Sequence, residues 1–492
     1  MSANNTILQF NVENPPNLGV DTTITTDCND NPEENSRMND NIIFQEDSLD
    51  IGKRNKTIHS KAYCGMRGDS VLSGVLNITV SAIGGGCFGF PYMMYEGGII
   101  VILLIFLFVT ASIYYTIDLL RSFVVDTKYF SFALMTETIL GPKWLKTYAL
   151  SSFIIYVSMV INYLTSIYDY IEGMIGFDDN IFYHLMYFII TIIIEIFICL
   201  YITKMANMMH FLSIVSIFCF TLITFSLIVV SIYLNFKGKV VNKFVYENLF
   251  FPKISPKTFA NKLLKISSYI MEYVYGYSYH STFPTLIGYL RYVNNSNTKK
   301  VHYMSFSIVV FTYWAVTFFG FIFSTDVPKQ ILIEDDKYFN EGWYILRIPF
   351  KIALVIYLLT LIPIRFIVLR DNYVTLFGQK KLSSFSEFFI ILLFIFFSNI
   401  FVLAFIISDK LLEEWDVRRL LQAFGGMFGV IISFCLPVIN YVSVNGKRKL
   451  KSIIGYIITG FYVLVGIFST SYTFYKIFSG NDDDKHEENT SK

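Results

Sequence analysis

The chain has 492 residues and a formal net charge of +1, with 54% hydrophobic and only 16% charged residues. A nearly neutral chain offers no basic surface for nucleic acid, so we expect no nucleic-acid partner. The charges lie between long apolar runs, and Gly98 to Ile117 contains twenty residues without a charge. That length crosses a bilayer core of about 30 Å. The composition therefore excludes a soluble globular protein and predicts a multi-pass integral membrane protein.

Polar segments flank the apolar region. Residues 1–67 are rich in Asn, Asp, Thr and Glu and have too few large apolar side chains to form a core, so we expect a disordered cytosolic tail. Residues 479–492 form a short acidic C-terminal tail. The membrane domain is expected between them, at residues 68–478.

Eleven apolar runs are long enough to be membrane-spanning helices. They are expected at residues 71–95, 98–119, 147–170, 181–202, 210–233, 268–291, 303–324, 346–369, 386–407, 419–442 and 452–476. The sequence therefore predicts an all-α integral membrane fold with about eleven transmembrane helices.

Lysine and arginine residues in short loops indicate the cytosolic side of a membrane protein. They cluster before the first run and after the second, eighth and tenth runs, which all fall on one side if the chain crosses eleven times. We therefore expect a cytosolic N-terminus and an outer or lumenal C-terminus. The loop at residues 234–266 disagrees, because it carries seven lysines and a single acid on the opposite side.

The first apolar run is interrupted by Gly84, Gly85 and Gly86, with Gly89 and Pro91 following. In lipid every backbone amide and carbonyl needs a partner, so a broken helix is tolerated only where protein or a wet cavity covers it. Glycine also lets a ligand approach the backbone closely. The alternative is a glycine-rich helix-packing face, which three consecutive glycines followed by a proline fit less well.

A second interruption lies in the sixth run, where residues 276–284 read GYSYHSTFP. Tyr277, Tyr279 and His280 could line a cavity, and Pro284 could restart the helix. Two broken helices, each the first of its half of the chain, are typical of inverted-repeat transporters with a midplane substrate site.

A helix break exposes an N-terminal dipole end that attracts a carboxylate and a C-terminal end that attracts an ammonium group. Two breaks therefore suit a zwitterionic amino acid as substrate. No fixed acid adjoins the first break, which favours a neutral or aromatic amino acid, although Glu272 leaves a cationic one open. The expected substrate-binding residues at the breaks are Ala82, Ile83, Gly84, Gly85, Gly86, Cys87, Tyr277, Ser278 and Tyr279.

Ionisable residues inside membrane spans are functional candidates. His280, Glu272 and Glu195 are therefore candidates for proton coupling, and histidine titrates near physiological pH. The alternatives remain open: His280 could simply bond the unwound backbone, and each acid could form a structural ion pair with Lys351 or Arg365.

Four stretches in order resemble the amino acid/auxin permease family over Ser70 to about Phe478. They are the glycine-rich stretch at residues 84–91, the Tyr-Ser-Tyr-His stretch with its later proline at residues 277–284, Pro363 with Arg365, and Gly425-Gly426 with Pro437. The resemblance implies two inverted five-helix repeats plus one extra helix (a LeuT-like fold), with the first and sixth helices discontinuous. It also implies that the third span lines the site, and Tyr156 and Asn162 are its candidates.

Sodium-coupled members of that family carry an Asn before the first-span glycines and a Thr in the eighth span. This chain has Val80 and Ile356 at the corresponding positions. Apolar side chains cannot supply oxygen ligands to a hard cation. The chain also has no phosphate-binding loop, nucleophile elbow or metalloprotease motif, so we expect no enzyme activity, cofactor or metal.

The sequence therefore predicts an amino acid transporter that is proton-coupled or facilitative rather than sodium-coupled. It would act in the plasma membrane or in an acidic vacuole or lysosome-like compartment. The alternative is a membrane amino acid sensor that signals through residues 1–67.

Overall fold

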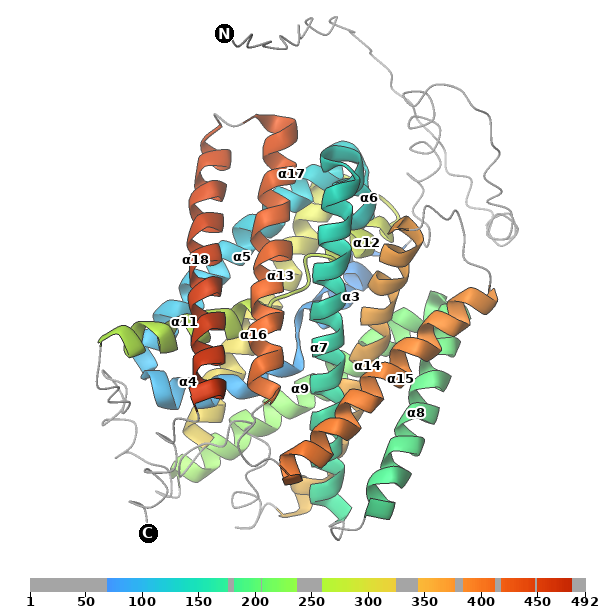
Figure 1. Ribbon diagram of the computed structural model, residues 1–492, viewed down its shortest axis with the longest axis vertical. Coiled ribbons are helices and arrows are strands. Elements are labelled where there is room, and N and C mark those ends of the chain that lie inside the picture. Colours follow the sequence, from blue (N-terminus) through green and yellow to red (C-terminus); the bar gives the residue numbers. More distant parts are fainter. Residues whose placement is uncertain are drawn as a thin grey trace, which may run out of the picture. The chain divides into compact units, whose positions relative to one another are not determined.

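The computed structural model describes residues 69–175, 181–204, 206–236, 259–323, 344–376, 384–411, 417–446 and 449–479. The N-terminal tail, and the C-terminal tail beyond Ser479, lie outside this described part. Nearly all of the described chain is helical (Figure 1).

Each of the eleven expected spans coincides with a helix or with a broken helix. The elements are α3 (Val71–Ala82), η1 (Gly85–Gly89), α4 (Phe90–Gly97), α5 (Ile99–Thr127), α6 (Phe132–Leu140), α7 (Pro142–Ile175), α8 (Ile181–Lys204), α9 (Ala206–Phe236), α11 (Phe259–Gly276), α12 (Phe283–Gly288), α13 (Asn295–Phe323), α14 (Tyr344–Leu376), α15 (Ser384–Leu411), α16 (Val417–Val430), η3 (Ile431–Cys435), α17 (Leu436–Asn445) and α18 (Leu450–Ser479).

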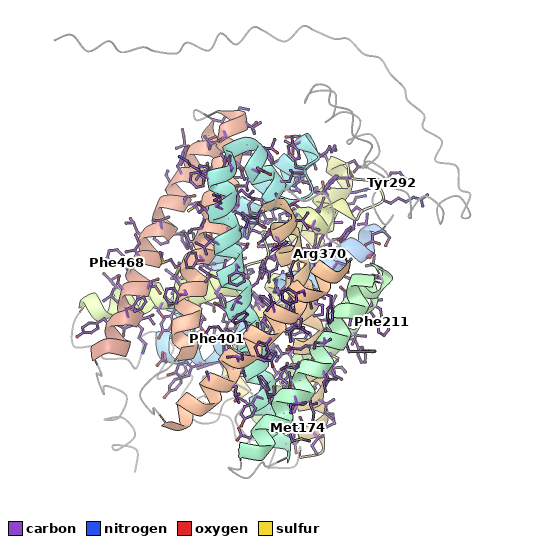
Figure 2. All side chains as sticks on the ribbon, turned by 45° about the vertical axis from the view of Figure 1, so that its right-hand side comes forward. Met174, Phe211, Tyr292, Arg370, Phe401 and Phe468 are labelled. Atoms are coloured by element: carbon purple, nitrogen blue, oxygen red, sulfur yellow. The ribbon has the colours of Figure 1, made fainter. Side chains whose placement is uncertain are left out.

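Seven helices of the described part are long and apolar enough to cross a membrane, and the bent pair at the start of the chain makes an eighth if it is one span. Large apolar side chains point outward from these helices, as Figure 2 shows for Phe211, Phe401 and Phe468, each more than half exposed. Such an exposed apolar surface is stable only against lipid or another apolar partner. Eleven crossings stays a prediction.

Two helices begin well before the apolar runs that predicted them. α11 begins at Phe259 rather than near residue 268, and its Lys265 forms a 3.1 Å ion pair with Glu96 on α4. α13 begins at Asn295 rather than near residue 303, because the Asn294 side chain accepts a 2.7 Å hydrogen bond from Asn297 N. Polar first turns are invisible to a hydropathy pattern, although capping residues stabilise them.

The long helix α7 packs along α14 and α16, and α14 also packs against α9 (Figure 1). The broken span that begins with α3 packs against α13 and α9, while α11 packs against α16, α18 and α5. The two breaks therefore lie among α7, α13, α14 and α16. In contrast, α8 packs mainly against α15.

Glycines on α16 let it approach the second broken span closely. A Cβ added at Gly425 would lie 2.4 Å from the Tyr275 ring, and one at Gly429 would lie 3.2 Å from Ser278 Oγ. Gly425 and Gly429 form a GxxxG pair, and these contacts show that it serves helix packing. The same span changes to π-helix over Ile431–Cys435, just before Pro437, whose missing N–H prevents a regular helical bond.

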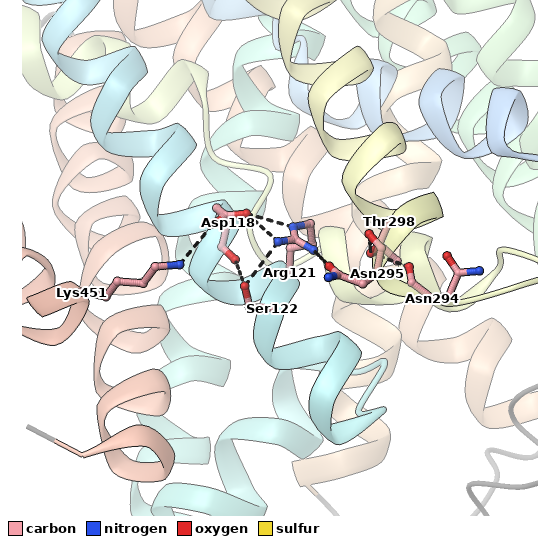
Figure 3. Close-up of polar contacts among 7 residues, drawn as sticks. All are labelled: Asp118, Arg121, Ser122, Asn294, Asn295, Thr298 and Lys451. Atoms are coloured by element: carbon pink, nitrogen blue, oxygen red, sulfur yellow. Dashed lines mark hydrogen bonds and ion pairs between the residues drawn. The ribbon is translucent and has the colours of Figure 1, made fainter. Parts of the chain in front are cut away.

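A polar network ties one end of α5 to two other helices (Figure 3). Asp118 accepts a 2.9 Å hydrogen bond from Arg121 Nε and lies 3.9 Å from Lys451 Nζ on α18. Arg121 Nη1 in turn donates to Asn295 Oδ1 on α13, at 2.6 Å. Tyr115 also donates to the backbone carbonyl of Lys451. These contacts hold α5, α13 and α18 together at this end of the bundle.

Candidate substrate site

The first apolar run is broken where the glycines predict. α3 ends at Ala82, Ile83 and Gly84 are extended, and the chain resumes as the short 3-10 helix η1 and then α4. The two halves differ in direction by 52°. Ser70 caps α3 at its start by accepting a hydrogen bond from Ser73 N. The helix is therefore interrupted at the glycine segment, as the sequence predicts.

The second break spans residues 277–282, between α11 and α12. The backbone turns tightly there, since Tyr279 N donates to Tyr277 O at 2.8 Å and Thr282 N donates to Tyr279 O at 3.1 Å. Pro284 lies in the first turn of α12, where its missing N–H costs nothing. All six side chains of the break are buried, so protein covers the unwound backbone as the lipid environment requires.

The hydroxyl of Tyr313 on α13 joins the two breaks. It accepts a 3.1 Å hydrogen bond from Gly84 N and lies 2.8 Å from Ala82 O and 2.7 Å from Gly276 O. Both carbonyls belong to the last residue of a half-helix, where no intrahelical amide remains to bond them. A hydroxyl has one hydrogen, so Tyr313 satisfies one of the two carbonyls at a time.

A second tyrosine binds the first break from α14. Tyr357 donates to Ile83 O at 2.9 Å, and Thr360, one turn later, donates to Tyr357 O at 2.6 Å. The position expected to face an ion, Ile356, instead lies on the outer face of α14 with 39% of its surface exposed. One residue rotates a helix by about 100°, so a one-residue alignment error exchanges these faces.

The third span contributes Tyr156, as the resemblance implies. Its hydroxyl donates to Ser281 Oγ in the second break at 2.7 Å. Tyr163 lies seven residues, or about two turns, further along α7. Its hydroxyl is 3.6 Å from the position that a Cβ of Gly84 would occupy. Asn162 is half-buried on the same helix. α7 therefore contacts both breaks.

Among the remaining expected residues of the breaks, Cys87, Tyr277 and Ser278 are buried. Cys87 is fully buried and its amide donates to Gly84 O at 3.3 Å, while a Cβ at Gly86 would meet the Tyr275 ring. Gly85 begins η1. Tyr277 shares a 3.0 Å hydrogen bond with Thr110 on α5, and Ser278 donates to Val274 O at 2.9 Å.

His280 is fully buried in the second break. Its Nε2 shares a 2.9 Å hydrogen bond with Thr116 Oγ1 on α5, and its Nδ1 has no partner in the described part of the chain. His302 on α13 is also buried and interacts electrostatically with His280, Asp118 and Arg121. The sequence analysis missed His302, which lies just before the expected apolar run at residues 303–324 and comes shortly after two lysines.

The two acidic candidates lie away from this cluster. Glu195 is buried on α8 and accepts a 2.7 Å hydrogen bond from Asn399 Nδ2 on α15. Glu272 is half-buried on α11, one turn before Gly276, beside Tyr269 and Tyr273. The ion pairs found among the described residues do not join either acid to Arg365, whose hydrogen bond goes instead to the Tyr163 hydroxyl at 3.3 Å. The roles of both acids stay predictions.

Residues 67–479 match the family described as transmembrane amino acid transporter protein. Among solved structures, a mutant manganese transporter of Eremococcus coleocola is similar with a TM-score of 0.57 and 12% identity, over 89% of this chain and 90% of that chain. A Na⁺-coupled sialic acid symporter is similar with a TM-score of 0.54 and 13% identity, over 86% of this chain and 92% of that chain. Comparison with curated proteins found no match.

The two broken spans and these structural similarities define the class of the protein. It has the LeuT-like fold of a multi-pass membrane protein, and the family match makes it a secondary transporter and not an enzyme. The chain belongs to the transmembrane amino acid transporter family, whose match covers most of its length. The predicted fold class and family are confirmed, whereas the roles of the individual site residues stay predictions.

Proposed function

We propose that the protein transports an amino acid by alternating access and binds it between the two breaks. The observation that supports this most is the cluster around the Tyr313 hydroxyl, where Ala82 O and Gly276 O converge with one hydrogen between them. The carbonyl left without a full donor can accept a hydrogen bond from an ammonium group, which the negative end of a helix dipole also attracts. Uptake of labelled amino acids by proteoliposomes tests the proposal.

The same cluster argues against sodium coupling. A sodium site at a helix break needs backbone carbonyl oxygens that point into it. Tyr357 donates to Ile83 O at 2.9 Å, and the single hydrogen of Tyr313 satisfies one of the carbonyls of Ala82 and Gly276. One free carbonyl is enough to accept a hydrogen bond from an ammonium group, whereas a sodium ion needs several oxygen ligands at once. Proton coupling or facilitated diffusion is therefore our proposal.

His280 is the proposed proton-sensing group. It lies within the second break, bonds α5 through Thr116, and interacts electrostatically with His302, which in turn interacts with Asp118 and Arg121. A proton on His280 would turn its Nε2 into an obligatory donor to Thr116 and so bias the contact between the break and α5.

Replacing His280 by alanine is expected to flatten the pH profile of uptake, while a residual rate remains. Glu272→Gln, measured in parallel, tests the other acid near the breaks and is expected to keep the profile. Initial uptake rates at external pH values from about 5 to 8 give the comparison, a range that brackets histidine titration. Full pH dependence in both variants would remove these residues from the coupling mechanism.

The alternative function is an amino acid sensor with the same site, and only that function requires residues 1–67. We expect a variant that lacks those residues to take up amino acids at about the wild-type rate, because the family match begins at residue 67. Uptake and reporter signalling measured on the same cells separate the two roles. Amino acid binding without uptake in the full chain would favour the sensor.

The family and the fold do not determine the membrane. A proton-linked carrier suits either the plasma membrane or an acidic vacuole or lysosome-like compartment, with the N-terminus in the cytosol. Localisation of a tagged full-length chain distinguishes the two membranes, and protease protection of the tag reports the side.

A further inference from the structure

Arg365 on α14 is a buried cation with no counter-ion among the described residues. Its side chain is only 1% exposed, and its Nε and Nη1 have no hydrogen-bond partner in the described part of the chain. The ion pairs found among those residues do not include it. A guanidinium group keeps its charge at any physiological pH. An isolated charge in a membrane protein is costly and usually faces a functional partner.

Tyrosines surround the guanidinium group, and each of them also contacts a break. Tyr163, which accepts the 3.3 Å bond from Arg365 Nη2, lies 3.6 Å from the Cβ position of Gly84. Tyr156, whose ring centroid is 5.6 Å from the guanidinium carbon, donates to Ser281 in the second break. Tyr357, also an electrostatic neighbour of Arg365, donates to the Ile83 carbonyl. A single side chain therefore separates Arg365 from either break.

We propose that Arg365 binds the carboxylate of the transported amino acid. The inference rests on the proposed function and deepens it, since it names the group that fixes one end of the substrate. Carboxylate is the anion that a guanidinium group binds best, through parallel charge-assisted hydrogen bonds, and Arg365 has two nitrogens with unused hydrogens.

The substrate then lies across the first break. Its ammonium group bonds the carbonyl cluster at Tyr313, and its carboxylate bonds Arg365, with Tyr163 between the two. Arg365 thereby determines specificity: it accepts amino acids and excludes amines, amides and esters that lack the negative charge. The tyrosines around Arg365 are neutral, so its positive charge is available to pair with the carboxylate of an entering substrate.

The test compares each amino acid with its own carboxamide, which differs only in lacking the negative charge. Wild-type proteoliposomes are first screened with the twenty labelled amino acids, and the best substrate then competes with the unlabelled acid or carboxamide. We expect wild type to prefer the acid by about 100-fold, and Arg365→Gln to reduce that preference to about threefold or less. Arg365→Lys keeps the charge without the planar fork and should give an intermediate ratio.

Arg370→Gln is the matched control, because Arg370 lies on the same helix and has contacts of its own (Figure 2). It should keep the wild-type ratio. A purely structural role for Arg365 would lower the amount of folded protein and leave the ratio of acid to carboxamide unchanged. That result would overturn the inference.

The outcomes also separate this inference from the proposed function. Wild type that takes up none of the twenty amino acids contradicts the proposed function, and the inference falls with it. If wild type transports and the Arg365→Gln variant keeps the full preference for the acid, the proposed function stands and Arg365 is not part of the site.

Discussion

Replacing Tyr313 by phenylalanine is expected to abolish most transport and to lower stability. The hydroxyl accepts from Gly84 N and bonds the carbonyl cluster of Ala82 and Gly276, all of it buried. Each buried polar group left without a partner costs about 1–3 kcal/mol. If the arrangement of the breaks that binds substrate loses that much stability, the uptake rate falls by about 10- to 100-fold, since each 1.4 kcal/mol is about tenfold.

The measurement is initial uptake per folded protein in proteoliposomes, alongside thermal unfolding in detergent. Tyr303→Phe is the control, because Tyr303 is on the same helix α13 but 62% exposed on its outer face. It should behave as wild type in both assays. If Tyr313→Phe transports within about twofold of wild type, the hydroxyl does not hold the two breaks in their working arrangement.

Replacing Gly84 by valine is expected to reduce uptake at least about 50-fold with little loss of folded protein, equivalent to more than 2 kcal/mol in the rate. Gly84 has φ −102° and ψ 159°, which any residue adopts, and a Cβ there meets Gly276 O and Tyr163 Oη at an ordinary 3.6 Å. The two further methyl groups of valine would extend into the space between the breaks. They would block the approach of a substrate to the backbone that glycine allows.

Gly84→Ala and Gly460→Val complete the series. Alanine adds only the single carbon that the site accommodates, so its uptake should lie between wild type and valine. Gly460 on α18 has no atom within 4 Å of its Cβ position, so valine there should leave uptake unchanged. Uptake rates divided by the amount of folded protein test this order of wild type, Gly84→Ala and Gly84→Val. Wild-type uptake in Gly84→Val would mean that the substrate does not approach the first break.

Local residue types were sufficient to predict both broken spans. Gly84 to Gly86 with Pro91, and Gly276 with Pro284, favour a break in the helix, because glycine tolerates non-helical backbone and proline lacks an N–H. The family resemblance added Tyr156, which does bond the second break. These features depend on a few neighbouring residues or on a family motif, so they can be predicted from the sequence alone.

The residues that connect the breaks could not be predicted in the same way. The chain has 34 tyrosines, and only the packing of α13 and α14 distinguishes Tyr313 and Tyr357 from the others. Helical phase was a further source of error, because Ile356 and Tyr357 are neighbours in sequence but lie on different faces of α14, one exposed and one buried. Arg365 was considered only as part of the family resemblance and as a partner for an acid, since its burial among tyrosines is a property of the tertiary structure.

Uptake into proteoliposomes, with and without an inward proton gradient, tests the central claim most directly. The protein is reconstituted as wild type and as Gly84→Val, and a labelled mixture of the twenty amino acids is supplied in sodium-free buffer. We expect wild type to accumulate at least one amino acid without sodium, faster with the gradient if transport is proton-coupled, and Gly84→Val to accumulate none. Uptake that requires sodium, or equal uptake by the valine variant, would contradict the account of a carrier that binds its substrate at the first break.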